Sequence, residues 1–406
     1  RSTLFPYTTL FRSLADVGFS TVLSEVIKMP YFISYLKARG SWASVGSAIP
    51  RNLSSSFKYS YDPATQGYVS ESYLMPDEFY PERTYSWEAG LTAKFLHGLI
   101  NFDATLYKSN TTKQTFLRSI SPSGGYSSKY IQMGDVENRG VELSLGLDKR
   151  FGAFEWGSYL TYSANINKIV KLIEDNPTEE IHKGGFNQIE VILREGGTMG
   201  DLYVYNDLER DHEGNLLINE KDMVVKKTLS EPRFVGSVLP KGNVGWRNDF
   251  RYKGFNFGFM FAARLGGINV STTQAILDQY GVSERSAKDR DHDGIDVNLG
   301  KIDTQGYYQV VGGENAVWSE YIYSATNVRL QEAYIGYNCP VQLLGNRVVL
   351  GLSLTGRNLL MLYNKSPFDP ELTASTGTYY QGFDYFMQPS LHNLPKIGRA
   401  SCRERV

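Results

Sequence analysis

The sequence predicts an all-β protein whose strands form a transmembrane antiparallel β-barrel. Three observations predict this fold: apolar and polar residues alternate with period two, the alternating runs come in pairs joined by short turns, and long polar segments separate the pairs. Such alternation gives each strand one apolar and one polar face. The runs reach roughly ten residues or more, about the length that a tilted strand needs to cross a bilayer. Strands of globular proteins more often have about five or six residues.

The first two predicted hairpins cover residues 85–107 and 141–162. The first strand places on one face Tyr85, Trp87, Ala89, Leu91, Ala93 and Phe95, and on the other Ser86, Glu88, Gly90, Thr92 and Lys94. His97-Gly98 then offers a tight turn, and the alternation resumes at Ile100. In the second hairpin, Val141, Leu143, Leu145 and Leu147 alternate with Glu142, Ser144, Gly146 and Asp148. Its bend is expected at Arg150-Phe151-Gly152.

The third predicted hairpin has the clearest pattern of the four. One strand carries Val244, Trp246, Asn248, Phe250 and Tyr252, and after Lys253-Gly254 the other returns with Phe255, Phe257, Phe259, Phe261, Ala263 and Leu265. The fourth pairs Ala333, Ile335 and Tyr337 with Val348, Leu350, Leu352 and Leu354, through a connection from Cys339 to Asn346. Trp87, Phe102, Leu143, Phe257, Phe259 and Leu350 are expected to face lipid, and Glu88, Asp103, Glu142, Asn256 and Ser353 the lumen. On this basis an arginine at Phe259 should destabilise the barrel by roughly 2–4 kcal/mol near the bilayer midplane, and one at Gly258, which would face water, should cost much less.

A soluble β-sandwich also fits alternation, because its polar face lies in bulk water. The bias of the polar face toward Gly, Ser and Thr and the length of the hairpins favour a barrel lumen. Polar segments between hairpins are expected as long loops at one end, namely Ser109–Asn138, Lys168–Leu193, Asp207–Pro240 and Asn269–Ser324. In all, the pattern gives roughly a dozen strands.

Composition excludes several classes of protein. The net charge of -1 gives no basic field for nucleic acid, so no nucleic-acid partner is expected. No apolar run is long enough for a transmembrane helix. Two cysteines, Cys339 and Cys402, do not suffice for a disulfide framework.

The two ends of the chain have an unusual composition. TLFPYTTLFRS near the start is similar to the translation of a common short-read sequencing adapter, and IGRASCRERV at the end is similar to that of its reverse complement. We therefore expect residues 1–13 and 397–406 to be adapter-derived and residues 14–396 to be a partial barrel domain.

Several stretches resemble SusC/RagA-type TonB-dependent outer-membrane transporters. These stretches are FISYLKARGSWASVG (32–46), TYSWEAGLTAKF (84–95), NRGVELSL (138–145), WRNDFRYKGFNFGFMFAARLGG (246–267) and LTGRNLLMLYNKSPFDPEL (354–372). The resemblance implies part of a 22-stranded barrel plugged by an N-terminal domain, a location in the outer membrane of a Gram-negative cell, and contact with the lipid bilayer. It implies import of a bulky nutrient, either an oligosaccharide or a peptide. The implied partners are a SusD-like surface lipoprotein and TonB, which would act through an N-terminal region missing from this chain.

One motif suggests a metal. Asp289, Asp291 and Asp293 precede Gly294 with the D-x-D-x-D-G spacing of a calcium loop. The glutamate expected six residues after the glycine is replaced by Gly300, and no flanking helices are evident, so an acidic surface loop is favoured over a calcium site. Residues 211–215 predict a hairpin turn.

No residue pattern indicates catalysis, so we expect no enzyme activity and no cofactor. The five histidines lack paired spacing for zinc, and no carboxylate pair stands out. Aromatic residues in loops or strand ends could stack on sugars, but packing or an interfacial girdle is the commoner role; they are Tyr126, Tyr130, Tyr379, Tyr380, Phe383, Tyr385 and Phe386. The alternatives to a transporter are a soluble all-β glycan-binding module and a secreted β-rich enzyme.

Overall fold

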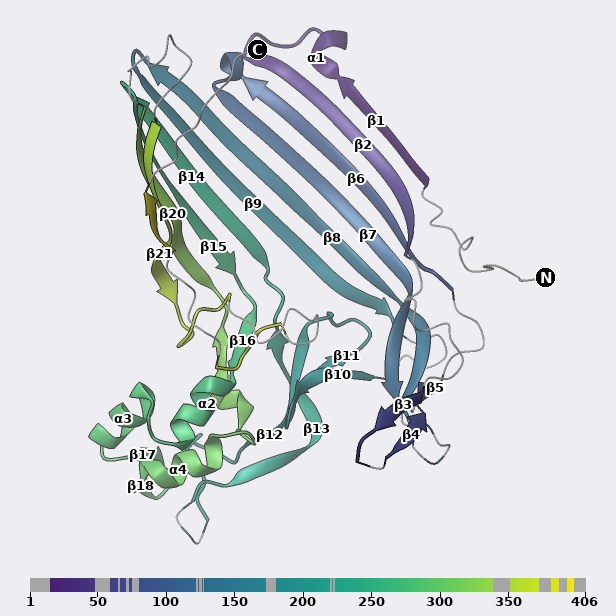
Figure 1. The fold of residues 1–406 in the computed structure, drawn as a ribbon, viewed down its shortest axis with the longest axis vertical. Helices are drawn as coiled ribbons and strands as arrows, with labels where there is room; N and C mark the ends of the chain where they lie inside the picture. The colour runs from purple at the N-terminus through teal and green to yellow at the C-terminus, as the bar shows by residue number, and fades with distance from the viewer. Residues whose placement is uncertain are drawn as a thin grey trace, which may run out of the picture.

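A curved sheet of twelve strands dominates the computed structural model (Figure 1). The structure describes residues 15–47, 59–64, 66–70, 73–74, 80–121, 123, 126, 128–172, 180–219, 221, 223–338, 351–371, 381–386 and 393–397. Neighbouring strands in the sheet run antiparallel in the order β1 (Ala15–Val22), β2 (Ile33–Ser47), β6 (Glu82–Phe95), β7 (Ile100–Ser119), β8 (Ser128–Phe151), β9 (Phe154–Lys171), β14 (Gly242–Tyr252), β15 (Phe255–Leu265), β20 (Asn327–Asn338), β21 (Gly351–Asn364) and β23 (Asn393–Ile397). The twelfth strand, β5 (Tyr73–Leu74), pairs in parallel with β8. The helix α1 (Leu23–Val26) connects β1 to β2, and β3 (Tyr59–Asp62) pairs with β4 (Gly67–Ser70) in a separate hairpin.

The predicted hairpins are confirmed. Phe95 pairs with Ile100, Phe151 with Phe154 and Tyr252 with Phe255, so each bend falls where the alternation breaks. A 3₁₀ turn (η1, Leu96–Gly98) forms the first bend, and Lys253 (φ 46°) and Gly254 (φ 87°) make the third with positive φ angles. In the fourth hairpin Ile335 pairs with Leu354, while its connection lies outside the described residues. These short turns lie together at one end of the sheet (Figure 1).

The strands extend further than the sequence predicts at the opposite end. Residues 109–138, expected to be a loop, continue β7 and β8 as a paired ribbon as far as Ser119 opposite Ser128. The prediction was wrong because the apolar alternation stops near Tyr107, whereas backbone pairing continues without it. Backbone hydrogen bonds are sufficient to hold two strands that are already in register.

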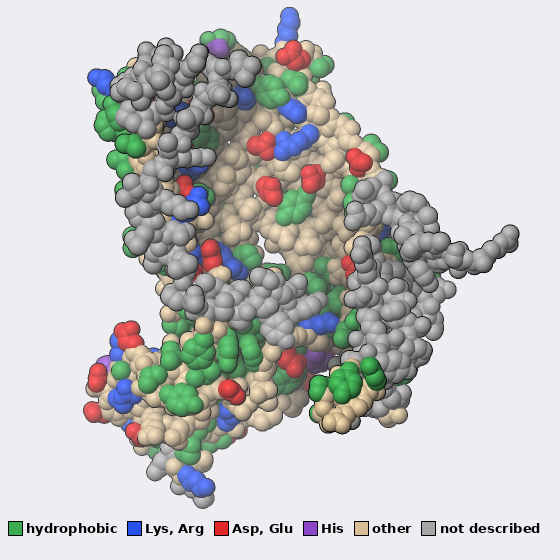
Figure 2. All heavy atoms as spheres, in the orientation of Figure 1, with side chains coloured by type: hydrophobic (Ala, Val, Ile, Leu, Met, Phe, Trp, Pro, Cys, Tyr) green, Lys and Arg blue, Asp and Glu red, His purple; other side chains and the backbone are tan. Residues whose placement is uncertain are grey.

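The two faces of the sheet differ as expected. Trp87, Leu145 and Phe257 are 46%, 46% and 44% exposed on the apolar face. On the other face, Arg39 pairs with Asp103 through an Nη2–Oδ1 contact of 2.8 Å, and the Thr92 hydroxyl donates to Asp103 at 2.6 Å. Figure 2 shows acidic and basic side chains standing in the hollow of the curved sheet. Exposed aromatic and aliphatic side chains on the convex face match the outer surface of a membrane barrel.

Gly258 corrects one expectation about the polar face. The ring of Tyr334 packs against Gly258. A Cβ added at Gly258 would lie 2.4 Å from Tyr334 Cε1 and 2.9 Å from the Asn248 carbonyl oxygen. Tyr334 is fixed there because its hydroxyl donates to Asp249 at 2.7 Å. Position 258 is therefore filled by a neighbouring ring and is not the open, water-facing position on which the small expected cost of an arginine was based.

We accordingly expect Gly258→Ala to destabilise the barrel by roughly 1–3 kcal/mol, the usual effect of overpacking. The free energy of unfolding of the full-length protein in lipid vesicles measures this loss. Combined with Tyr334→Ala, which removes the clashing ring, the glycine substitution should add much less. Equal losses in the two backgrounds would contradict the contact.

A second region, here called the cap, lies at the end of the sheet opposite the short turns (Figure 1). It contains β10 (Ile181–Phe186), β11 (Ile189–Leu193), β12 (Asp201–Leu208), β13 (Lys226–Ser237), β16 (Ile268–Ser271), α2 (Thr272–Gln279), α3 (Glu284–Asp291), β17 (Ile295–Val297), β18 (Gly300–Ile302), α4 (Thr304–Val311), η3 (Trp318–Tyr321), β19 (Ile322–Ser324) and β22 (Phe383–Asp384). β10–β13 form one sheet, and β16 lies between β19 and β22 in another.

The cap has a closed hydrophobic core. Fully buried side chains include Ile189, Leu193, Leu202, Trp318 and Phe383. Segments 168–193, 207–240 and 269–324 were expected as polar loops, so the cap is a correction to the sequence analysis. Within the described ranges no helix is long and apolar enough to cross a membrane.

Candidate functional site

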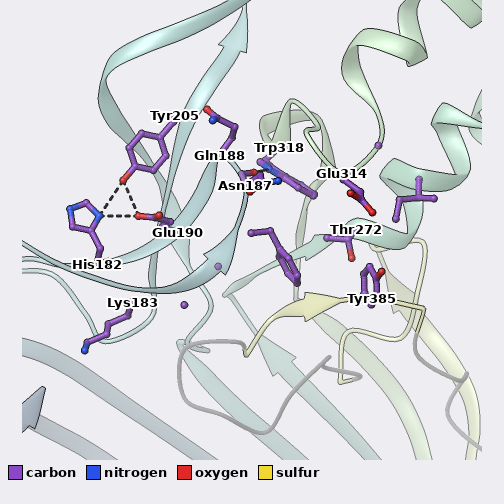
Figure 3. A pocket seen from close by; sticks show the side chains of 15 residues that line it. His182, Lys183, Asn187, Gln188, Glu190, Tyr205, Thr272, Glu314, Trp318 and Tyr385 are labelled. Carbon is purple, nitrogen blue, oxygen red and sulfur yellow. Dashed lines mark hydrogen bonds and ion pairs between the residues drawn. The ribbon is translucent and has the colours of Figure 1, made fainter. Parts of the chain in front are cut away.

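A cleft of about 1000 Å³ opens in the cap between the β10–β12 sheet and α2 (Figure 3). Its walls come from segments distant in sequence: His182, Lys183, Gly184, Gly185, Phe186, Asn187, Gln188, Glu190, Tyr205, Thr272, Ile276, Gly313, Glu314, Trp318 and Tyr385. The lining thus combines aromatic rings with many hydrogen-bonding and charged side chains, which can fix the orientation of a ligand.

A polar trio occupies the sheet side of the cleft (Figure 3). His182 on β10 and Glu190 on β11 lie on adjacent strands, with His182 Nδ1 2.9 Å from Glu190 Oε2. The Tyr205 hydroxyl from β12 donates to the same carboxylate oxygen at 2.9 Å and lies 3.2 Å from His182 Nδ1. Three neighbouring strands thus hold one hydrogen-bonded group on a rigid surface.

Tyr205 holds its proton more tightly than an ordinary tyrosine. Burial raises its pKa, and the hydrogen bond and negative charge of Glu190 raise the pKa further. A raised pKa in the folded state means that the stabilisation is complete below about pH 10, the pKa of an unfolded tyrosine, and decreases above it.

We therefore expect the stability of the cap to fall as the pH rises above 10, and Tyr205→Phe to remove part of that fall. The phenylalanine keeps the ring but has no proton to lose. Thermal unfolding followed from neutral to alkaline pH measures the effect. Parallel pH curves for the wild type and the variant would contradict it.

An aromatic wall forms the other side of the cleft. Phe186 packs between Trp318 and Tyr385, with ring centroids 6.5 Å and 6.3 Å away, and it meets the buried Phe383 edge to face at 5.2 Å. The indole nitrogen of Trp318 donates to the carbonyl oxygen of Asn187, so η3 is fixed to the β10–β11 turn. The row of rings runs from Trp318, which is 1% exposed, to Tyr385, which is 47% exposed.

The exposed end of this wall is fastened to α2. β22 pairs in parallel with β16, placing Phe383 beside Val270 and Asp384 beside Ser271. The Ser271 hydroxyl donates to the Asp384 carboxylate at 2.7 Å and also accepts from the Gln274 amide, which caps α2. Tyr385 therefore follows a strand, β22, that is held to β16 by backbone pairing and by the Ser271–Asp384 hydrogen bond, although the two strands are more than a hundred residues apart in sequence.

One glycine determines the shape of the β10–β11 hairpin. Gly185 adopts a φ of 153° at a bulge, and a Cβ there would lie 2.3 Å from the Ile189 carbonyl oxygen. Only glycine fits such a close approach. The bulge directly precedes Phe186, whose ring packs between those of Trp318 and Tyr385.

The basic groups near the cleft are bound to backbone carbonyls. Lys183 donates to the Leu117 carbonyl oxygen at the end of β7, and Lys226 donates to that of Asn315. Burial lowers the pKa of each ammonium group. Glu190 and Glu314 supply the carboxylates of the lining, so the cleft offers acidic and aromatic surfaces to a ligand.

The aspartates of the D-x-D-x-D-G motif lie elsewhere. Asp289 and Asp291 belong to α3, a helix that the sequence analysis did not expect, and Asp293 and Gly294 follow it with φ angles of 61° and 103°. Asp289 accepts a hydrogen bond from the Tyr308 hydroxyl. Within the described ranges no group of three His, Cys, Asp or Glu residues could hold a metal ion.

Two other predicted features can be placed. Residues 211–215 form the expected hairpin turn, because the Asp211 amide donates to the Asn215 carbonyl at 2.9 Å and Gly214 has a φ of 91°. Among the loop aromatics, Phe383 packs in the core as expected, whereas Tyr385 lines the cleft. Tyr379 and Tyr380 lie outside the described residues. Trp318 and the His182–Glu190–Tyr205 trio were missed, since no spacing in the sequence links them.

Known proteins are similar to this chain in sequence and in fold. The family described as "TonB dependent receptor-like, beta-barrel" matches residues 31–275. TonB-dependent receptor P3 of Formosa agariphila is 26% identical over 410 residues, covering 93% of this chain and 40% of the relative. TonB-dependent receptor SusC of Bacteroides thetaiotaomicron is 25% identical, covering 63% of this chain and 27% of that protein.

Solved structures agree on the fold. The RagAB peptide importer in its open-open state superposes with a TM-score of 0.67 at 18% identity, covering 90% of this chain and 41% of that one. The chain thus spans about 40% of the length of relatives such as receptor P3. Because the family match covers more than half of the chain and the expected SusC/RagA resemblance is confirmed, this chain belongs to the TonB-dependent receptor β-barrel family of the bacterial outer membrane.

Proposed function

We propose that this chain is a barrel portion of a transporter that imports a bulky nutrient, an oligosaccharide or a peptide, across the outer membrane. The observation that carries the proposal is the cap cleft at the long-loop end of a sheet whose hollow is polar. In outer-membrane barrels the short turns face the periplasm and the long loops face the exterior. The cleft would therefore meet the nutrient before it enters the barrel.

One observation favours a peptide as the nutrient, and another favours an oligosaccharide. The RagAB structures are those of a peptide importer, which favours a peptide by analogy of fold alone. The aromatic wall of the cleft would equally suit stacking against sugar rings. Both classes remain part of the proposal.

The partners follow from the same reasoning. A SusD-like lipoprotein would cover the cap from outside, and TonB would supply energy from the periplasm through a plug region. A soluble glycan-binding module does not fit an outer-membrane receptor, and the family is one of receptors and not of enzymes.

Deletion of the gene tests the proposal. We expect the deletion strain to lose growth on one class of oligomer, peptide or glycan, while growth on the corresponding monomers stays normal. Restoring the full-length gene should recover growth, but not in a strain lacking TonB. Unchanged growth of the deletion strain on every oligomer would overturn the importer.

A further inference from the structure

Glu314 is the acidic group at the α2 end of the cleft. It follows α4 and lines the cleft together with Thr272 and Tyr385, which are drawn at the same end of the cleft in Figure 3. Within the described part of the chain, Glu314 makes no hydrogen bond or ion pair and its side chain is exposed. A second hollow of about 380 Å³ shares Glu314 and Ile276 with the cleft, so this carboxylate lies where two cavities meet.

The lysine that lines the second hollow makes no ion pair with Glu314. Lys226 lines it, but its ammonium group donates to the neighbouring Asn315 carbonyl oxygen. At the other end of the cleft, Lys183 donates to Leu117 on β7. The carboxylate of Glu314 therefore remains available to a ligand.

The aromatic wall complements this charge. Tyr385 is 47% exposed, and its ring stacks on Phe186 at an interplanar angle of 24°. A ring face attracts a cation through its quadrupole, and the attraction grows when the cation is partly desolvated, as in a cleft. A carboxylate and an exposed aromatic ring at the same end of a cleft offer an ammonium or guanidinium group an ion pair and a cation–π contact.

We propose that Glu314, Tyr385 and Phe186 form a subsite for a positively charged group on the imported molecule. The inference rests on the proposed importer function and specifies the charge of its cargo. Such a group comes from two sources, a lysine or arginine side chain of a peptide or the free amine of an amino sugar. A polyanionic segment is disfavoured at this end of the cleft, because the Glu314 carboxylate lies there without an ion pair to any residue that the structure describes.

Binding of matched probes to the purified full-length receptor tests the subsite. One pair is a hexapeptide of alternating glycine and lysine and its Nε-acetylated form. The other pair is the glucosamine hexamer and the N-acetylglucosamine hexamer. Calorimetry should show the charged member of at least one pair binding about tenfold more tightly than its acetylated partner. The pair that shows the difference identifies the source of the charge.

Substitutions in the subsite separate its two parts. Glu314→Gln should remove most of the preference and leave the affinity for the acetylated probe within about twofold. Tyr385→Leu should reduce the preference, whereas Tyr385→Phe, which keeps the ring face, should retain it. Glu213→Gln, in the exposed 211–215 turn outside the cleft, is the matched control and should change nothing.

Three outcomes would overturn the subsite: equal binding of charged and acetylated probes, no measurable binding of either pair, or an equal loss for all probes in Glu314→Gln. Uptake by cells distinguishes this failure from failure of the importer. Uptake of oligomers without charge preference refutes the subsite alone. Charge-selective binding without any uptake refutes the importer alone.

Discussion

Replacing Arg285 by methionine should destabilise the cap by about 2–4 kcal/mol, because it leaves a buried carboxylate without its cation. Arg285 is the second residue of α3, and its guanidinium carbon lies 5.5 Å and 5.6 Å from the ring centroids of Tyr308 and Tyr321. Its Nη1 is 3.8 Å from the carboxylate of Asp278, whose side chain is 0% exposed. Arg285 is itself 34% exposed, which keeps the expected loss below that of a fully buried pair.

Hydrogen exchange in the full-length receptor measures this loss locally. Amides of α2 and α4 should exchange faster in Arg285→Met, while those of β8 and β9 in the barrel should not change. Lys288→Met is the matched control on the same helix, because Lys288 pairs with Glu284 at the surface and should contribute less than about 1 kcal/mol. Adding Asp278→Asn, which removes the orphaned charge, should restore part of the protection. Equal exchange in Arg285→Met and Lys288→Met would contradict the role of the cluster.

The barrel was predictable because one local rule governs it. A membrane strand must alternate its faces residue by residue, so Phe255 to Leu265 reveal both the strand and its orientation. The turn at Lys253-Gly254 is equally local. Gly258 was misjudged because its surroundings depend on Tyr334 of β20, which is a neighbour only in the folded sheet.

The cap could not be predicted in the same way, since its contacts are distant in sequence. Phe383 pairs with Val270, and Trp318 bonds to Asn187. Neither contact leaves a periodic signal. One local signal was present: Ser283 caps α3 by accepting from the Ser286 amide, and serine before an acidic first turn is a helix-start pattern. The D-x-D-x-D-G spacing overlaps the same helix and indicates a loop, so the two local patterns conflict.

Replacing Leu145 by arginine should destabilise the barrel by roughly 2–4 kcal/mol if the side chain lies near the bilayer midplane. Leu145 is six residues from the turn that follows Phe151, and it is 46% exposed on the convex face beside Leu160. Lipid would surround an arginine there, and no acidic residue pairs with this position across β7 or β9.

Ser144→Arg is the matched control, because it adds the same charge one residue away on the opposite face. Ser144 pairs with Asp103 across β7 and lines a hollow with Glu142, so the new cation would meet water, the Glu142 carboxylate and the existing Arg39–Asp103 ion pair. Its loss should stay below about 1 kcal/mol. Urea unfolding of the full-length receptor in lipid vesicles compares the two variants at matched depth. Similar losses, or a larger loss for Ser144→Arg, would mean that the convex face does not contact lipid and that the orientation of every strand in the sheet must be reversed.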